Sequence, residues 1–305
     1  MFTKKLIAAA VLGLGLTGAA QAGTVDFTFQ PCGNAGCAVQ TQTLDWAPGN
    51  VLALDGAGGG APLPIGTAVT DLYQANLAVA QNSNGDIVFT NGGGGSFFSV
   101  VAGFGEVVNP LSAGNQTQFS FNPADPTNFF YVYADGTSGN NLTGAGFAGG
   151  TLVLSGAIVA VESSVTATNF DPTGVPLDGS GGNDYPGITT ITTNGSAKVT
   201  VKVNTVNAAY FPDLPVATSI VLALTNSSLI TPFNQVNPSA NFSSNGILDA
   251  DLPHGIGAQN GITGPNFQFQ ADGNSAFLIP EPGSLALIGA SLLGLFGIRR
   301  RKEIA

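Results

Sequence analysis

The sequence predicts an all-β fold whose body is an antiparallel β-sandwich or jelly-roll-like domain. Apolar and polar residues alternate with a period of two at 24–29, 116–121 and 197–203, as in strands with one buried face. The chain also has 43 glycines, and short strands separated by glycine-rich turns are typical of sandwiches. No body segment keeps a helical period over three turns, although Leu72–Ala80 could form one short helix.

The first 22 residues have the pattern of a secretory signal peptide, which would form an N-terminal signal helix. Lys4 and Lys5 supply its positive charge, and an apolar stretch follows them. Ala20 and Ala22 then give a small-x-small cleavage pattern. An N-terminal core helix is the alternative, but nothing in its first turn would cap a helix. We therefore exclude residues 1–22 from the fold and expect the rest to be exported.

The chain has two cysteines, Cys32 and Cys37. Export permits a disulfide between them, and Gly33 and Gly36 make the intervening loop flexible enough to close. A zinc site is the alternative, but zinc needs about four ligands and His254 is the only histidine. The sequence therefore predicts a local disulfide, which stabilises the fold only modestly because its loop is short.

Other strand candidates are more continuously apolar and rich in Val, Ile, Phe and Thr. They lie at 86–90, 96–108, 129–134, 151–162 and 218–225. Asn194-Gly195 lies between two alternating segments and predicts a β-hairpin, since both turn positions need positive φ. Further turns are expected at Asp55-Gly56, Asn84-Gly85 and Asp135-Gly136.

We expect one exported β-rich domain over residues 23–278, with two packed subdomains as the alternative. No internal repeat of fixed period and no clear linker divides this stretch. Loops are expected at 92–95, at 171–187 and over much of 226–264, where glycine and polar residues predominate.

The body is strongly acidic. It contains 16 Asp and Glu residues but only two basic residues, Lys198 and Lys202, so its net charge is about −14. Nucleic-acid binding needs Lys and Arg to neutralise phosphates, so this composition excludes nucleic acid as a partner. Binding to an anionic membrane face is disfavoured for the same reason. The acidity favours solubility and would attract divalent cations.

The sequence offers no good catalytic constellation, and we expect no enzyme activity. A glycosidase needs two placed carboxylates, and the glutamates of the body are Glu106 and Glu162, both on strand candidates. Nothing in the sequence brings these two residues together. Trp46 is the only tryptophan that could stack on a sugar ring, and no G-x-S-x-G elbow accompanies His254.

No cofactor is expected, with calcium as the alternative. Asp178, Asn183 and Asp184 lie in one glycine-bearing loop and offer oxygen ligands. The loop does not fit the EF-hand pattern, which needs a Glu at its twelfth position. An acidic, turn-rich loop without a metal explains the same residues.

Residues 279–305 combine three features. Pro280-Glu281-Pro282 precedes an uncharged segment, Gly283–Ile298, and the basic residues Arg299, Arg300, Arg301 and Lys302 follow. The uncharged segment is somewhat shorter than the roughly 20 residues of a comfortable bilayer span, and flanking arginines could extend its reach. We expect a short C-terminal transmembrane helix whose basic end stays in the cytoplasm, with the body outside.

This arrangement of triplet, apolar segment and basic cluster resembles the PEP-CTERM sorting signal of Gram-negative bacteria. The resemblance implies an exported protein that is recognised and processed by exosortase, a membrane enzyme that resembles transpeptidases. It also implies transient anchoring in the inner membrane and a final place at the cell surface or in the extracellular matrix. In that family, sorting accompanies exopolysaccharide biosynthesis. A simple single-pass anchor would use the same residues.

From these observations we expect a structural or adhesive protein of an exopolysaccharide-associated biofilm or floc. Its expected partners are exosortase and exopolysaccharide or another matrix component. The alternative is a secreted protein that binds or hydrolyses polysaccharide.

Overall fold

The computed structural model describes residues 24–54, 63–112, 116–140, 146–169, 192–216, 218–227 and 267–278 of the 305-residue chain. Residues Asp26–Phe277 form one compact unit. The predicted signal peptide, calcium loop and C-terminal sorting segment lie outside the described residues.

Strands make up most of the described structure. They are β1 Phe27–Phe29, β2 Val39–Thr41, β3 Thr43–Leu54, β4 Ala68–Gln81, β5 Ile87–Thr90, β6 Phe97–Val108, β7 Gln116–Phe121, β8 Phe129–Asp135, β9 Thr151–Asn169, β10 Thr192–Val206, β11 Ser219–Ser227 and β12 Phe267–Leu278. Two single-turn 3-10 helices, η1 Ala35–Cys37 and η2 Gly93–Gly95, are the helical elements of the described ranges.

The main sheet closes on itself through antiparallel pairs. Its strands hydrogen-bond in the order β5-β4-β3-β12-β11-β10-β9-β7-β6-β8, with additional pairs β4–β6 and β9–β8. Following the pairs β3–β12–β11–β10–β9–β8–β6–β4–β3 therefore returns to the starting strand. Such closure leaves few free edges, which are the usual sites of unwanted strand pairing. The strands β1 and β2 form a separate two-stranded sheet.

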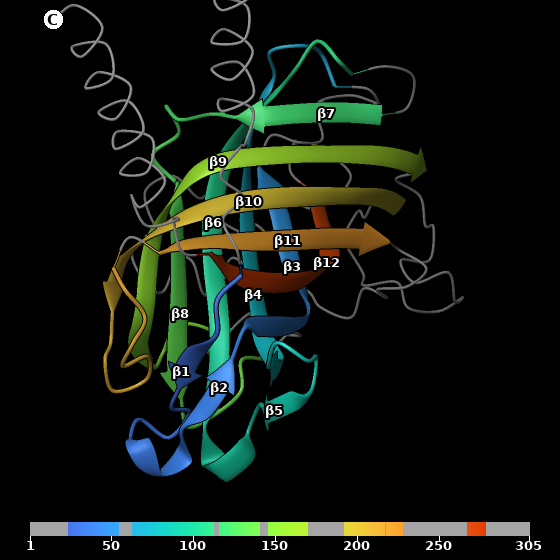
Figure 1. Ribbon diagram of the computed structural model, residues 1–305. Helices are drawn as coiled ribbons and strands as arrows, with labels where there is room; N and C mark the ends of the chain where they lie inside the picture. The colour runs from blue at the N-terminus through green and yellow to red at the C-terminus, as the bar shows by residue number, and fades with distance from the viewer. Residues whose placement is uncertain are drawn as a thin grey trace, which may run out of the picture. The chain divides into compact units, whose positions relative to one another are not determined.

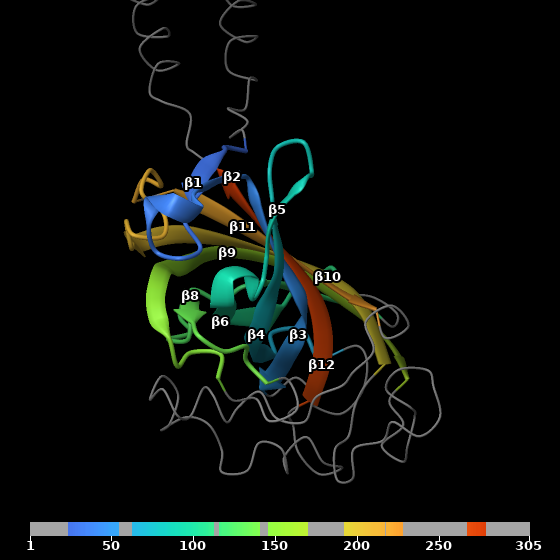
Figure 2. The same cartoon turned by 90° about the horizontal axis from the view of Figure 1, so that it is seen from below.

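The closed sheet is flattened into two crossing layers. Figure 1 shows β9, β10 and β11 running across β3, β4, β6 and β8, and Figure 2 shows β12, β3 and β4 side by side. The long strand β9 joins the layers, because its first part pairs with β8 and its last part pairs with β7. Register shifts in the β9–β10 pair, at Thr200/Val201 and Val203/Thr205, give the local bends that such corners need. The predicted all-β antiparallel sandwich is confirmed.

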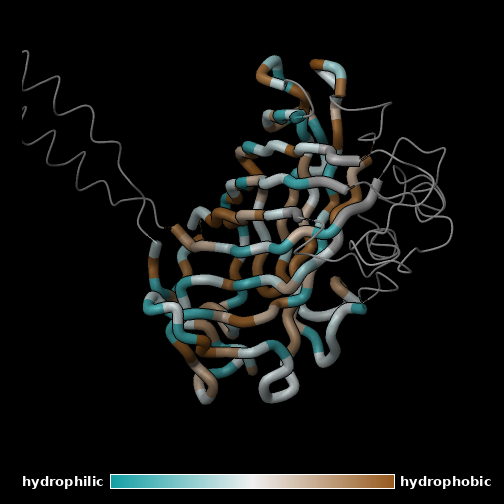
Figure 3. The backbone as a smooth tube through the Cα atoms, turned by 90° about the vertical axis from the view of Figure 1, so that its right-hand side faces the viewer, coloured by the Kyte–Doolittle hydropathy of each residue, from teal (hydrophilic) through white to brown (hydrophobic). Residues whose placement is uncertain are grey.

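The space between the layers is filled by apolar side chains from both. Hydrophobic and hydrophilic residues alternate along many strands in Figure 3, as expected for strands with one inward face. The ring centroids of Phe27 and Phe277 lie 4.3 Å apart, and those of Phe29 and Phe211 lie 5.3 Å apart. The first and last strands of the body therefore meet in one aromatic cluster.

Trp46 is the largest side chain of this core and is fully buried. Its indole N–H donates a hydrogen bond of 2.8 Å to the hydroxyl of Ser275, which is also fully buried. The bond joins β3 to β12 on the inner face, and it satisfies a donor that burial would otherwise leave unpaired.

Strand β6 is buried on both faces, because two loops cover its outer side. Asp125 packs over Gly105, where a Cβ would have no room, and accepts hydrogen bonds from Thr70 Oγ1 at 2.6 Å and Thr127 N at 2.8 Å. Farther along the strand, Ser99 donates to the carbonyl of the fully buried Phe147. This double cover explains why β6 is an almost continuous apolar run.

Two local predictions were wrong. Leu72–Ala80, expected as a possible helix, lies within strand β4, because pairing with β3 and β6 on either side overrides the weak helical pattern. Asn194-Gly195 is not a hairpin turn. Both residues lie inside β10 and pair with β9 and β11, and a Cβ at Gly195 would lie 2.7 Å from the carbonyl oxygen of Ser164. Close strand approach, not positive φ, therefore explains this glycine.

Other local predictions were confirmed. The alternating segment 116–121 is β7, with the same bounds. Asn84-Gly85 forms the turn between β4 and β5, where Gly85 has φ +83° and its N–H donates to the carbonyl of Asn82 at 3.0 Å.

Replacing Ser275 by alanine should destabilise the body by about 1–3 kcal/mol, because it leaves the buried indole N–H of Trp46 without an acceptor. Urea unfolding followed by tryptophan fluorescence measures this change, since Trp46 is the only tryptophan. The exposed Ser196 offers a matched control, and Ser196→Ala should change the free energy of unfolding very little. Equal effects of the two substitutions would contradict a role for the Trp46–Ser275 bond.

Candidate functional site

Two carboxyl groups face each other inside the sandwich. Asp71 lies on β4 and Glu106 on the neighbouring β6, and the register pairs Asp71 with Phe104 and Val69 with Glu106. The two acids are therefore diagonal neighbours on the inward face, within reach of each other's side chains. Asp71 is 9% exposed and Glu106 is 2% exposed. Two buried acids on adjacent strands are the most unusual chemical feature of the described residues.

Burial dominates the electrostatics of this pair. It raises the pKa of Asp71 to about 7, and a hydrogen bond from Glu106 opposes part of that rise. The pKa of Glu106 is raised well above its usual range, first by burial and then by the negative charge of Asp71. Glu106 therefore keeps its proton longer and donates it in a hydrogen bond to Asp71.

The surroundings of the pair contain polar groups but no described cation. The hydroxyl of Ser163, on β9, lies near Glu106 and lowers its pKa slightly against the larger effects. Within the described residues, Oε1 of Glu106 has no hydrogen-bond partner. Lys198 and Lys202 are exposed on β10, so neither neutralises the pair. A proton is therefore the neutralising partner that the described residues provide.

The two glutamates considered for glycoside hydrolysis are not brought together. Glu106 pairs in register with Phe121 of β7, and Glu162 pairs with the adjacent Ser120, so the two side chains lie on opposite faces of the sheet. Glu162 is exposed and lies opposite Lys198 in the β9–β10 pair. It is thus a solvent-facing member of its strand.

A second acidic pair, Asp45 and Asp272, lies on the neighbouring strands β3 and β12. Burial raises the pKa of Asp45, on β3, and the charge of Asp272 adds to that rise. Burial also raises the pKa of Asp272, although a hydrogen bond from the backbone N–H of Gly273 lowers it in part. Among the described residues, no group of three or more His, Cys, Asp or Glu side chains could hold a metal ion. The calcium candidates Asp178, Asn183 and Asp184 lie outside the described residues.

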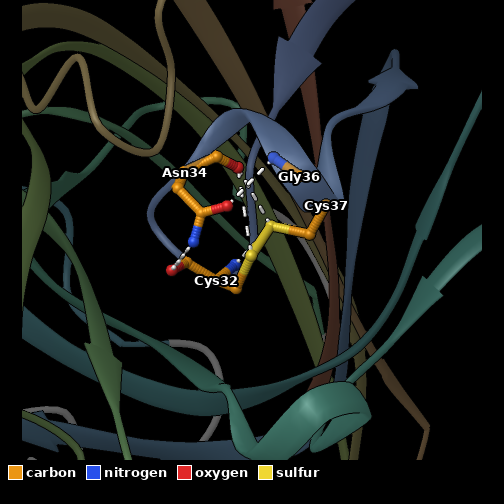
Figure 4. Close-up of a disulfide and its surroundings, with 4 residues drawn as sticks. All are labelled: Cys32, Asn34, Gly36 and Cys37. Atoms are coloured by element: carbon orange, nitrogen blue, oxygen red, sulfur yellow. Dashed lines mark hydrogen bonds between the residues drawn. A yellow bond between two sulfur atoms is a disulfide. The ribbon is translucent and has the colours of Figure 1, made fainter.

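The structure joins Cys32 and Cys37 by a disulfide, with their Cα atoms 6.1 Å apart (Figure 4). Asn34 organises the loop between them. Its side-chain oxygen accepts from Gly36 N at 2.9 Å, and its amide nitrogen donates to the carbonyl of Cys32 at 3.3 Å. The loop carries no free thiol, and its compact geometry points to a structural role.

An aromatic strip lies on the outer face of β8. Phe129, Tyr131 and Tyr133 alternate along the strand, with ring centroids 5.1 Å apart for the first pair and 6.3 Å apart for the second. Phe129 is buried, whereas the two tyrosines are partly exposed. Trp46, which the sequence suggested as a residue for stacking on a sugar ring, is fully buried in the core and therefore cannot contact a sugar. The period-two aromatics of the sequence FFYVYAD were the signal for this strip.

The remaining predicted site residues lie outside the described ranges. These are Ala20 and Ala22, His254, Pro280, Glu281, Pro282, the uncharged segment 283–298, and Arg299, Arg300, Arg301 and Lys302. Within the described ranges there is no helix long and apolar enough to cross a membrane.

Comparison with protein families confirms that the C-terminal segment resembles a PEP-CTERM sorting signal. The family model of the PEP-CTERM protein-sorting motif matches residues 278–302. Comparisons with curated proteins and with solved structures found no significant match. The chain therefore carries a PEP-CTERM sorting motif at its C-terminal end behind a β-sandwich body of unidentified family. The motif marks it as an exported protein that exosortase processes.

The free energy of unfolding should fall as the pH rises. In the unfolded chain, Asp and Glu ionise near about pH 4. Because the folded-state pKa values of Asp71 and Glu106 are raised, their stabilising contribution is complete below about pH 4 and is lost as the pH rises toward 7 and beyond. Thermal unfolding between pH 4 and 8 tests this trend. Asp71→Asn should flatten the profile, whereas the exposed-site control Glu162→Gln should leave its slope unchanged.

Proposed function

We propose that the protein is a structural and adhesive component of an exopolysaccharide-associated matrix, released or displayed after exosortase sorting. The observation that carries this proposal is the sorting motif at 278–302, which directly follows the last strand of the folded body. A structural role outside the cell requires a stable folded body, which the closed sheet provides, and does not require a catalytic cleft. The proposed final location is the cell surface or the extracellular matrix, after transient anchoring in the inner membrane.

We infer that the body is not an enzyme. Among the described residues, the close pair of acids on the inward face is Asp71 and Glu106, and it is buried between the layers. A hydrolase acting on a polymer would need its two carboxyls to flank the scissile bond. The other glutamate of the body, Glu162, faces away from that pair. These positions support display and cohesion over turnover.

Polysaccharide binding is the second candidate, and the aromatic strip on β8 favours it. Tyr131 and Tyr133 are partly exposed aromatic residues that carry hydroxyl groups, a combination suited to amphipathic ligands such as sugar rings. The body has only two lysines and a net charge of about −14, so it cannot neutralise a polyanion with its own side chains. We therefore propose a neutral polysaccharide as the direct ligand. An anionic one would need divalent cations such as calcium as bridges.

The sorting motif makes its own prediction. Replacing Pro280-Glu281-Pro282 by alanines should make the protein accumulate unprocessed in the membrane fraction, because exosortase no longer recognises the tail. Mass spectrometry of the C-terminal peptide measures the processing. Glu303→Ala, which lies beyond the matched residues, is the control and should be processed normally. A wild-type protein that still ends at Ala305 in cells would contradict the sorting proposal.

The matrix role is tested in a deletion strain. Loss of the protein should reduce cell aggregation and surface attachment, and wild-type protein should restore both. If the β8 strip contacts polysaccharide, Tyr131→Ala combined with Tyr133→Ala should weaken retention on purified matrix polysaccharide by about tenfold or more, since central aromatic side chains commonly contribute about 2 kcal/mol.

Tyr210 is the matched control, because it is partly exposed on a different surface segment. Tyr210→Ala should retain polysaccharide like the wild type. Normal aggregation in the deletion strain would overturn the matrix role. Release of reducing sugars by the purified protein, abolished by Glu106→Gln, would overturn the non-enzymatic proposal.

A further inference from the structure

The buried acid pair lies near the short strand β7, which pairs with β6 on one side and with β9 on the other. Glu106 begins the three-residue stretch of β6 that pairs with β7, ending at Val108. On its other side, β7 pairs with β9 over Gln116–Ser120. The strand β7 therefore bridges β6 and β9 at the end of the sandwich where the acid pair is located, as Figure 1 shows for the three strands.

Few side chains hold β7 in place. Thr117 is its one buried residue, and its hydroxyl accepts a hydrogen bond from Leu63 N at 3.3 Å. Phe119 is partly buried against a small cluster that includes Val69 and Val108, and Phe121 packs against the main core. Segments with few buried contacts are the ones that open locally before the rest of a domain unfolds. The strand β7 pairs with β9 over Gln116–Ser120 and with β6 over Phe119–Phe121, so the end of β6 holds one of its two edges.

The two acids differ in how they can reach water. Asp71 lies inside β4 and is paired on both sides, with Ala53 of β3 and Phe104 of β6. Glu106 is also paired on both sides, with Val69 of β4 and Phe121 of β7, but its pair with β7 belongs to a stretch of only three residues that ends at Val108. Opening of this short β6–β7 stretch therefore gives Glu106 the shorter route to solvent.

Among the described residues, no positively charged side chain faces the pair and would neutralise the two carboxylates after ionisation. On β9 and β10, Glu162 and Lys198 are exposed, and the described β7 residues contain no titratable side chain. Asp125 lies on the opposite face of the β4–β6 pair, hydrogen-bonded to Thr70 and Thr127.

The remaining neighbours are also acidic or neutral. On β3 and β12, Asp45 is partly exposed and Asp272 is exposed. Tyr73, the next inward residue of β4, is a neutral phenol whose own pKa burial raises well above its usual value. Two negative charges at Asp71 and Glu106 would therefore stand uncompensated in a low-dielectric interior.

We propose that Asp71 and Glu106 form a proton-operated latch that holds the end of β6 and, through it, the strand β7. With two protons the pair is neutral, and with one shared proton it is a singly charged hydrogen-bonded unit. In both states the seam, meaning the β6–β7 pair, is closed. When both groups ionise, their repulsion and desolvation are relieved by fraying of β6 beyond Gly105, which exposes Glu106 to water and separates β7 from β6. The β9–β10–β11 pairs do not include these acids, so that part of the sandwich stays folded.

Hydrogen exchange of the full-length protein tests the latch. Protection of the β7 amides should fall by about tenfold or more between pH 5 and pH 9, after correction for the intrinsic pH dependence of exchange, because one unit of pKa displacement corresponds to a tenfold change in the opening equilibrium. Amides in the middle of β10, at Val199 and Val201, should lose clearly less protection over the same range, because they exchange through global unfolding and not through opening of the β6–β7 pair.

Three variants separate the latch from a general effect of pH. Glu106→Gln and Asp71→Asn should each remove most of the pH dependence at β7, since neither variant can place two charges at the seam. Glu162→Gln, which changes an exposed acid on β9, should behave like the wild type. A variant that fails to fold leaves the wild-type comparison of β7 with β10 as the deciding measurement. Equal loss of protection in both strands, or no loss in either, would overturn the proposal.

Discussion

The pairing of β12 with β3 and with β11 is the interaction on which the rest of the body depends. Without β12, the strand ladder would be open between those two neighbours, and both would present bare edges. The same strand delivers Ser275 to the indole of Trp46 and Phe277 to Phe27. The body is thus completed by its last strand, which ends at Leu278, where the sorting motif begins. The body can therefore close its sheet only when the chain up to the start of that motif is available for pairing.

The scarcity of basic residues shapes the interior as well as the surface. A buried carboxylate is normally paired with Lys or Arg, but the two lysines of the body are exposed on β10. Asp71 and Glu106 are therefore neutralised by a proton, and their pKa values rise because of burial. The composition that keeps the surface acidic thus also makes the sandwich interior sensitive to pH. The scarcity of Lys and Arg therefore affects both the charge of the surface and the stability of the core.

Sequence patterns predicted the strands whose burial is simple. The segment 116–121 alternates cleanly because one face of β7 is solvated, and its bounds agree with the structure. The strands β3 and β12 were missed because proline, glycine and polar residues interrupt them, notably Pro48-Gly49 and Asp272-Gly273, and irregular pairing absorbs these residues. The segment Leu72–Ala80 was misinterpreted because β4 is buried on both faces, so the period of two disappears from its sequence. Local patterns report one-sided burial and say little about a strand covered on both sides.

The same limitation explains why the acid pair could not be found from the sequence. Glu106 was noticed as a glutamate on a strand, but its partner, Asp71, lies one residue before the misinterpreted segment Leu72–Ala80 and is 35 positions away from Glu106. Their proximity follows from the register of β4 and β6, in which Val69 faces Glu106, and register is fixed by long-range packing. Glu162 looked equivalent to Glu106 in the sequence, yet it pairs with Ser120 while Glu106 pairs with Phe121, so the sheet turns them to opposite faces. Their partners on β7 are adjacent residues, and this difference of one position places Glu162 in solvent and Glu106 in the core, where it shares a proton with Asp71. The acid pair of the body therefore depends on which strands pair and in which register. Export, in contrast, is indicated by a contiguous motif that can be recognised from the sequence alone.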